Sequence, residues 1–143
     1  MSTDARTSPA PPACAGNAAT PATTLGSVRL AIGADIVWCP DLTAPVTGVV
    51  AADLMSDVLV DARPGYLLVT GLANVQVIRT ATIADLAGVV FARGKTIPPD
   101  VLALAREARV PVFRCQRSLF ETAGRLYAVV NGRAGNADGR PPA

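Results

Sequence analysis

The chain has 143 residues, and its 13 Lys and Arg against 11 Asp and Glu give a formal net charge of +2. This length is enough for one domain. The small net charge argues against a dedicated nucleic-acid-binding protein, because such domains usually carry a strong basic excess. Half of the residues are apolar but only 4% are aromatic, so we expect a core built mostly from Val, Leu, Ile and Ala.

Several residue types that catalysis or metal binding would require are missing or few. The chain has no histidine, which removes the commonest general base and the commonest metal ligand. Its three cysteines, Cys14, Cys39 and Cys115, include no CxxC pair and predict neither a disulfide framework nor a zinc site. No apolar run approaches the roughly 20 residues of a membrane span, and the N-terminus lacks a secretory-signal pattern. These observations predict a cytoplasmic protein that is not an enzyme and has no cofactor, metal or membrane contact.

Both ends of the chain predict disordered tails. Residues 1–23 are rich in Ala, Pro, Ser and Thr without an apolar period, and residues 132–143 have a similar composition. Such segments cannot bury enough apolar surface to offset the entropy of ordering. We therefore expect one folded domain over residues 24–131.

The first half of this domain predicts a helix followed by three strands. Thr24 is suited to cap the helix and Gly33 to end it. Two strands follow, then a short helical turn, and then a fully apolar strand that ends before Thr70. The expected ranges are 24–32, 34–39, 46–54, 58–60 and 66–69.

The second half alternates helices with short apolar strands. Asn74 is suited to cap the first helix, and Ser118 with Glu121 forms a capping-box pattern at the start of the last one. The expected ranges are 75–86, 88–92, 98–109, 110–113 and 118–130. The whole order predicts an α/β fold, a layered α/β/α single domain with a mostly parallel sheet of about five strands. The last three strands are expected to be parallel, and the pairing of the first two stays open.

The loops after the last three strands form a candidate anion site. Ligands of open parallel sheets bind outside the carboxyl ends of the strands, where helix N-termini present free N–H groups and a partial positive charge. Residues 79–143 hold ten Lys and Arg against five Asp and Glu. Such an edge suits phosphate or carboxylate, and ordinary solvated loops are the alternative. The candidate ligand-binding residues are Thr70, Gly71, Asn74, Arg93, Gly94, Lys95, Thr96, Arg114, Arg117 and Ser118.

Three further features favour structure over chemistry. The sequence Gly94–Thr96 resembles the end of a P-loop, but the pattern requires a glycine where Val89 stands. Cys115 lies near two arginines, an environment typical of reactive cysteines, and we favour a half-buried structural thiol instead. A group of carboxylates has no accompanying base, nucleophile or metal cluster and is expected to be solvated. This group consists of Asp53, Asp57 and Asp61.

The order and spacing of several short motifs resemble the DRTGG domain family over about residues 24–131. The motifs are Val46–Val50 followed by Asp53–Met55, Pro64-Gly65, Thr70-Gly71, Ile97–Leu102, Ala105, Val110–Val112 and Thr122-Ala123. The sequence departs from the residues that give the family its name. The Asp-Arg pair is replaced near Ala73-Asn74, and the Thr-Gly-Gly after the fourth strand is replaced by Ala92-Arg93-Gly94.

This resemblance implies a non-catalytic α/β domain that dimerises and acts in regulation or ligand sensing. The family is similar to the N-terminal domain of HPr kinase/phosphorylase, and in some pyrophosphatases it accompanies CBS domains that bind adenine nucleotides. We therefore expect a homodimer that binds a small phosphorylated ligand or adenine nucleotide. The alternative is an interaction or assembly module that serves a metabolic enzyme, such as an acetyltransferase, a kinase or a hydrogenase-type redox complex. Without a CxxC array, the chain is not expected to hold an iron–sulfur cluster itself.

Overall fold

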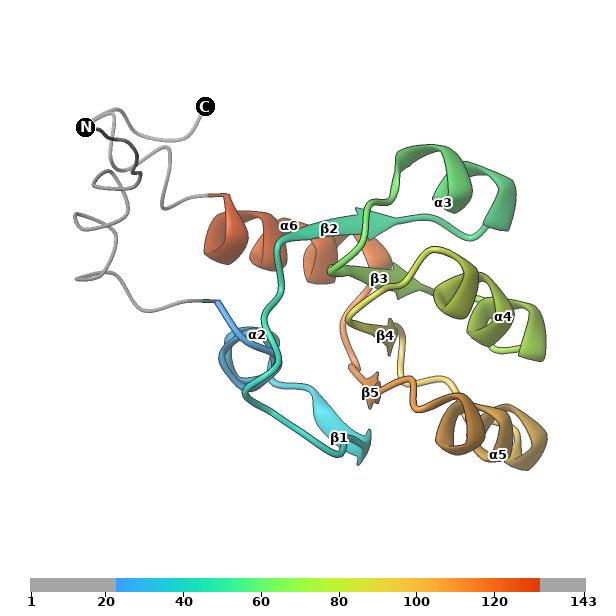
Figure 1. Cartoon of the computed structure of the whole chain (residues 1–143). Helices are drawn as coiled ribbons and strands as arrows, with labels where there is room; N and C mark the ends of the chain where they lie inside the picture. The colour runs from blue at the N-terminus through green and yellow to red at the C-terminus, as the bar shows by residue number, and fades with distance from the viewer. Residues whose placement is uncertain (1–22, 132–143) are drawn as a thin grey trace, which may run out of the picture.

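The computed structural model describes residues 23–131, which form a five-stranded sheet between two helical layers (Figure 1). The strands are β1 (Asp35–Trp38), β2 (Gly48–Ala51), β3 (Tyr66–Thr70), β4 (Gly88–Phe91) and β5 (Val112–Arg114). The helices are α2 (Leu25–Ile32), α3 (Met55–Asp61), α4 (Val75–Ile83), α5 (Pro99–Ala108) and α6 (Leu119–Val130). The predicted α/β/α fold is confirmed. Apart from Thr23, the two predicted tails lie outside the described residues.

The central strands are buried on both faces of the sheet, so both faces need a helical cover. Successive side chains of a strand point to opposite faces. In β3, Leu68 therefore packs in the core under α3, α4 and α5, whereas Leu67 and Val69 pack in the core under α2 and α6. All three side chains are completely buried. Continuous apolar runs of this kind are typical of parallel strands that are covered on both sides.

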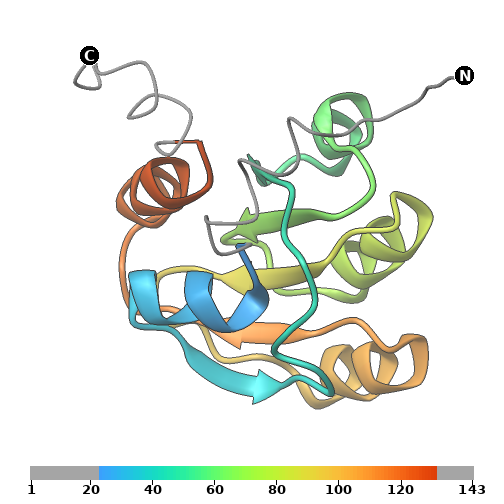
Figure 2. The ribbon, with the colours of Figure 1, turned by 60° about the vertical axis from the view of Figure 1, so that its left-hand side comes forward.

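The strand order β1-β5-β4-β3-β2 places the first two strands at opposite edges of the sheet. The last three strands are parallel, as predicted, and β2 joins them in parallel beside β3. β1 lies antiparallel to β5 at the other edge. The chain must therefore cross the whole sheet between β1 and β2, and its path runs over α2 (Figure 2). Backbone hydrogen bonds hold this crossing segment against α2. The N–H groups of Leu25 and Gly26 donate to the carbonyls of Ala44 and Leu42 at 3.0 and 2.8 Å.

β2 and α3 differ in length from the expected ranges 46–54 and 58–60. β2 is shorter because the chain turns at Asp53, whose carboxylate binds the end of β3. α3 is longer because Met55 and Val58, about one turn apart, are both buried and extend the helix toward its N-terminus.

The helix caps follow the sequence with one difference. The side chains of Thr24, Asn74 and Ser118 each accept a hydrogen bond from the N–H three residues later. The carboxylate of Glu121 pairs with Arg117 at 2.9 Å, whereas the capping-box pattern predicted a bond back to Ser118. In residues 23–131, no helix combines the length and the apolar character that crossing a membrane requires.

Substitution of Leu67 by Ala should lower the free energy of unfolding by about 2–5 kcal/mol, because it opens a cavity in a fully buried site. The matched control is Leu30→Ala on α2, where the leucine is 72% exposed and the change should stay within about 0.5 kcal/mol. Urea denaturation followed by circular dichroism measures both. Equal losses in the two variants would contradict the described burial of β3.

Candidate functional site

The loops that follow the parallel strands meet at one edge of the sheet, where Asp53 ties two of them together. The Thr70 hydroxyl donates to Asp53 Oδ1 at 3.0 Å, and the Gly71 N–H donates to the same oxygen at 2.7 Å. The Leu72 N–H in turn donates to Thr70 Oγ1 at 3.1 Å. Thr70 is completely buried, so this carboxylate satisfies a hydroxyl that has lost access to water. Asp53 therefore fixes the loop after β3.

Arg93 occupies the loop after β4 in an unusual backbone conformation. Its φ angle is 64°, and that of Gly94 is 62°, which places two consecutive residues in the left-handed region. The N–H groups of Arg93 and Gly94 donate to the carbonyls of Arg117 and Cys115, both at 2.8 Å. These two bonds join the loops after β4 and β5. A side chain other than Gly, Asn or Asp rarely adopts this conformation, so Arg93 stores strain at the edge of the sheet.

The Arg93 guanidinium crosses from its own loop to the loop after β3. A Cβ atom built on Gly71 would lie 2.6 Å from Arg93 Nη2, so the guanidinium lies directly against the Gly71 backbone. The absence of a side chain at this glycine is what allows the contact. This contact brings together Thr70, Gly71 and Arg93, and the Arg117 carbonyl joins these predicted site residues through its bond with the Arg93 N–H.

The four cations of the predicted site have different surroundings. Arg114 lies 4.0 Å from the Asp35 carboxylate on β1. Arg117 donates to the Ile32 carbonyl at 3.2 Å and pairs with a carboxylate on α6. Arg117 is therefore engaged in holding the fold, whereas the buried Nε of Arg114 has no hydrogen-bond partner in the part of the chain that the structure describes. Arg93 and Lys95 are exposed, and in residues 23–131 no carboxylate lies within ion-pair distance of either.

Most backbone N–H groups of these loops already have acceptors, whereas the sequence predicts free N–H groups for an anion. The loop N–H groups of Gly71, Arg93 and Gly94 all have acceptors within the chain. The N-termini of α4 and α5 lie on one face of the sheet and that of α6 on the other (Figure 1). The remaining predicted residues, Asn74, Thr96 and Ser118, are exposed, and Asn74 and Ser118 act as helix caps. An anion would therefore meet side chains more than backbone N–H groups.

A pocket of about 300 Å³ opens at the same edge, between the C-terminus of α2 and the loop after β5. It is lined by Ile32, Gly33, Cys115, Gln116 and Arg117. A volume of this order is at the lower end of small-molecule sites. A Cβ atom on Gly94 would lie 2.9 Å from Gln116 Cδ, so the pocket adjoins the Arg93 loop. The buried Cys115 thiol donates to the Ile32 carbonyl at 3.4 Å, an arrangement typical of a structural thiol.

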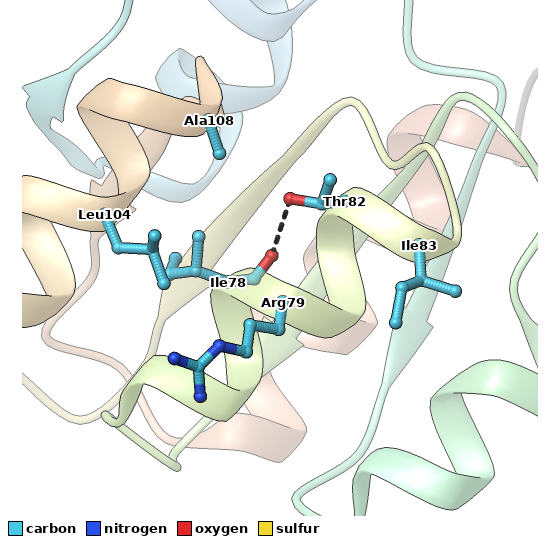
Figure 3. A pocket seen from close by; sticks show the side chains of 6 residues that line it. All are labelled: Ile78, Arg79, Thr82, Ile83, Leu104 and Ala108. Atoms are coloured by element: carbon cyan, nitrogen blue, oxygen red, sulfur yellow. Dashed lines mark hydrogen bonds between the residues drawn. The ribbon is translucent and has the colours of Figure 1, made fainter.

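A second hollow, of about 350 Å³, lies away from this edge between α4 and α5 (Figure 3). Its lining is almost wholly apolar and consists of Ile78, Arg79, Thr82, Ile83, Leu104 and Ala108. The Thr82 hydroxyl donates to the Ile78 carbonyl at 3.0 Å and so is engaged with its own helix. This groove offers one cation, Arg79, and few polar groups to orient a charged ligand, so the edge pocket is the better candidate for one.

Two described groups with a shifted pKa, Cys39 and Asp41, lie just after β1, at the end of the sheet opposite the candidate site. Burial raises the pKa of the Cys39 thiol. The hydroxyl and N–H of Thr43 lower the pKa of the Asp41 carboxyl by hydrogen bonding to it. Neither group takes part in the candidate site.

Sequence reasoning missed Asp53, Ile32, Gly33 and Gln116 as parts of this edge. The sequence predicts a solvated Asp53, whereas its observed role depends on the β2–β3 register, which local sequence does not reveal. Ile32 and Gly33 come from α2, which precedes the antiparallel strand β1. The position of Asp53 directly after a strand was the available signal, because polar residues at carboxyl ends of strands line ligand sites.

The DRTGG domain model matches residues 31–129 of the sequence. The chain belongs to the DRTGG domain family. Comparison with curated proteins finds no match. Among solved structures, the chain is similar to the CBS and DRTGG domains of the regulatory region of Clostridium perfringens pyrophosphatase, complexed with the activator diadenosine tetraphosphate. The TM-score is 0.60 at 18% identity, over 76% of this chain and 46% of that one, so the likeness shows the fold and the chain spans less than half of that structure.

The motif resemblance gives a reason for the strained loop. It places Ala92-Arg93-Gly94 where the family's Thr-Gly-Gly is expected, and so implies a glycine at the position of Arg93. The observed φ of 64° is one that glycine adopts at no steric cost. This chain keeps the glycine conformation but places an arginine in it.

Replacement of Asp53 by Ala should lower the free energy of unfolding by about 1–3 kcal/mol, because it leaves the buried Thr70 hydroxyl and the Gly71 N–H without their acceptor. Asp61→Ala, at the exposed end of α3, is the control and should change stability by no more than about 0.5 kcal/mol. Chemical denaturation gives both values. Hydrogen exchange at the Gly71 amide should accelerate only in Asp53→Ala, and an unchanged rate there would contradict the bond.

Exchange of Arg93 for Gly should raise the free energy of unfolding by about 1 kcal/mol. Glycine relieves the strain of the left-handed conformation in the folded state, which raises stability. Its larger backbone entropy in the unfolded state offsets part of this gain. The control is Arg63→Gly, since Arg63 has no positive φ and should gain nothing. Thermal unfolding compares the two. A loss of stability in Arg93→Gly would show that the Arg93 side chain stabilises the fold more than its backbone strains it.

Proposed function

We propose that this chain is a non-catalytic regulatory domain that binds a small phosphorylated ligand, with adenine nucleotides as the first candidates. The binding site is the edge formed by the loops after β3, β4 and β5. The proposal includes a homodimeric, cytoplasmic protein. Membership in the DRTGG family supports the regulatory role, and the activator complex of the similar pyrophosphatase region supports nucleotides as ligands to test.

The exposed Arg93 guanidinium, which has no carboxylate within ion-pair distance in residues 23–131, is the observation that carries this proposal. Its backbone angle alone does not mark a site, because Arg109 has a similar φ of 60° as the C-cap of α5. The Arg93 side chain is exposed, and its guanidinium contacts Gly71, so its N–H donors can face solvent beside the loops after β3 and β4. A planar guanidinium binds phosphate oxygens in pairs. Lys95, two residues further, adds a second cation at the same loop.

Three observations support a non-catalytic role. The chain contains no histidine. In residues 23–131, no group of three or more Cys, Asp or Glu side chains is arranged to hold a metal ion. The Asp53 carboxylate already accepts two hydrogen bonds within the fold, so it acts as a structural anchor more than as a general base.

Isothermal titration calorimetry of the full chain with diadenosine tetraphosphate, ATP, AMP and acetyl phosphate tests the proposal. We expect one of these to bind, and Arg93→Ala to weaken its binding by about 10-fold to 100-fold, the effect of losing a hydrogen bond to a charged group. Arg63→Ala, in the turn before β3 at the other edge, should bind like the wild type. Gly71→Ala keeps every charge but pushes the Arg93 guanidinium aside, so it should also weaken binding.

The outcomes separate ligand binding from general electrostatics. No heat with any of the four compounds would overturn the ligand claim. Equal weakening by Arg93→Ala and Arg63→Ala would show that only net charge matters. Affinity should fall as salt concentration rises, because salt screens exposed charges.

An assembly role for a metabolic enzyme is the second candidate, and exposed apolar side chains on α3 favour it. Val60 is 83% exposed and Leu54, just before the helix, is 60% exposed. Exposed apolar patches mark interaction sites in soluble domains. If this role holds, a stoichiometric partner should co-purify without nucleotide, and Val60→Asp should release it. Retention of the partner by Val60→Asp would exclude this surface.

A further inference from the structure

The edge pocket combines an apolar base with one amide and one guanidinium. Its volume is about 300 Å³, and the residues that line it come from the end of α2 and from the loop after β5. Ile32 and Cys115 are almost completely buried and form the apolar part, whereas Gln116 is exposed. Gly33 contributes no side chain, so the space between α2 and this loop stays open. An apolar surface with a few placed polar groups is typical of sites for small organic ligands.

The guanidinium of Arg117 is held by two hydrogen bonds to different parts of the fold. Its Nε donates to the Ile32 carbonyl at 3.2 Å, and its Nη1 donates to Glu121 Oε2 at 2.9 Å. The N–H groups of a guanidinium lie in its plane, so these bonds orient the group and leave its faces free. A Cβ atom built on Gly33 would lie 4.0 Å from Arg117 Nη2, so the glycine keeps room beside the group. A guanidinium face stacks on aromatic rings, and the pocket therefore offers a flat surface to one.

Gln116 supplies the hydrogen-bonding group of the pocket. A Cβ atom built on Gly94 would lie 2.9 Å from Gln116 Cδ, so the amide is positioned where Gly94 lacks a side chain. An amide offers both a donor and an acceptor, and glutamine uses the two together to bind N6 and N7 of adenine. Guanine presents two acceptors, O6 and N7, at the same edge. The amide of Gln116 is therefore complementary to adenine and not to guanine at this edge.

The pocket lies next to the loop that carries the exposed cations. The N–H of Arg93 donates to the Arg117 carbonyl, and the N–H of Gly94 donates to the Cys115 carbonyl, both at 2.8 Å. Neighbouring strands are about 4.8 Å apart, so the loops after β4 and β5 are separated by a distance that a ribose can span. Lys95, which directly follows Gly94, is exposed. A nucleotide with its base in the edge pocket can therefore extend its phosphates toward the loop after β4.

We propose that the edge pocket binds the adenine ring of a nucleotide, with Gln116 selecting adenine over guanine and Arg117 stacking on the ring. This inference rests on the proposed function and adds to it the part of the ligand that the pocket recognises. It also gives the two arginines separate tasks. Arg93 binds phosphate, whereas Arg117, whose charge is paired with Glu121, contacts the uncharged base.

Isothermal titration calorimetry of the full chain with ATP, GTP and 7-deaza-ATP tests the base contact. GTP should bind about 10-fold to 100-fold more weakly than ATP, the usual cost of a mismatch in such a two-bond contact. The 7-deaza analogue lacks the N7 acceptor and should also bind more weakly than ATP. Gln116→Ala should bind all three with similar affinity. Gln76→Ala removes an exposed amide from α4, on the other face of the sheet, and should keep the preference for ATP.

Adenosine, which has no phosphate, separates this inference from the proposed function. In nuclear magnetic resonance spectra, adenosine should shift the amide signals of Gly33, Gln116 and Arg117, and should still do so in Arg93→Ala. Equal affinities for ATP and GTP, or an unchanged preference in Gln116→Ala, would overturn the adenine pocket and keep the phosphate site. Shifts with adenosine but no binding of any nucleotide would overturn the phosphate site and keep the pocket. No response to adenosine or to any nucleotide would overturn both.

Discussion

The burial of β3 and β4 on both faces is the constraint from which the rest of the architecture follows. Side chains of these strands enter two cores in alternation, so neither face can meet water. Because β2 to β5 are parallel, the carboxyl ends of these four strands lie at the same edge of the sheet. The Asp53 hydrogen bonds and the exposed cations Arg93 and Lys95 lie at that edge, because the buried strands themselves leave no room for polar groups.

The element types and the layered fold could be predicted from the sequence, because they depend on local patterns. Apolar runs bounded by turns gave the strands, and capping residues such as Thr24 and Ser118 gave helix starts. The resemblance to the DRTGG family was also visible in short motifs and is confirmed by the family match. The length of α3 was underestimated because its exposed face carries Leu59 and Val60, which obscure the helical period.

The arrangement of the site could be predicted only in part. The positions of Thr70, Gly71 and Arg93 after neighbouring strands followed from the rule for parallel sheets. The engagement of Arg114 with β1 and of Arg117 with α2 could not be foreseen, because it depends on which strand lies beside β5. That pairing joins distant parts of the chain and leaves no local signature. The positive φ of Arg93 could not be predicted either, because arginine rarely adopts this backbone conformation.

The antiparallel pairing of β1 with β5 also determines the order in which the molecule can assemble. Cys115, just after β5, contacts Ile32 across 83 residues of chain. Contacts between such distant residues slow folding, because a large loop must close before they form. During synthesis, β1 therefore leaves the ribosome before the other described strands but has no strand partner until β5 exists. The middle of the chain, β2 to β4 with α3 and α4, can collapse earlier. The first described strand to be made is thus among the last to become native.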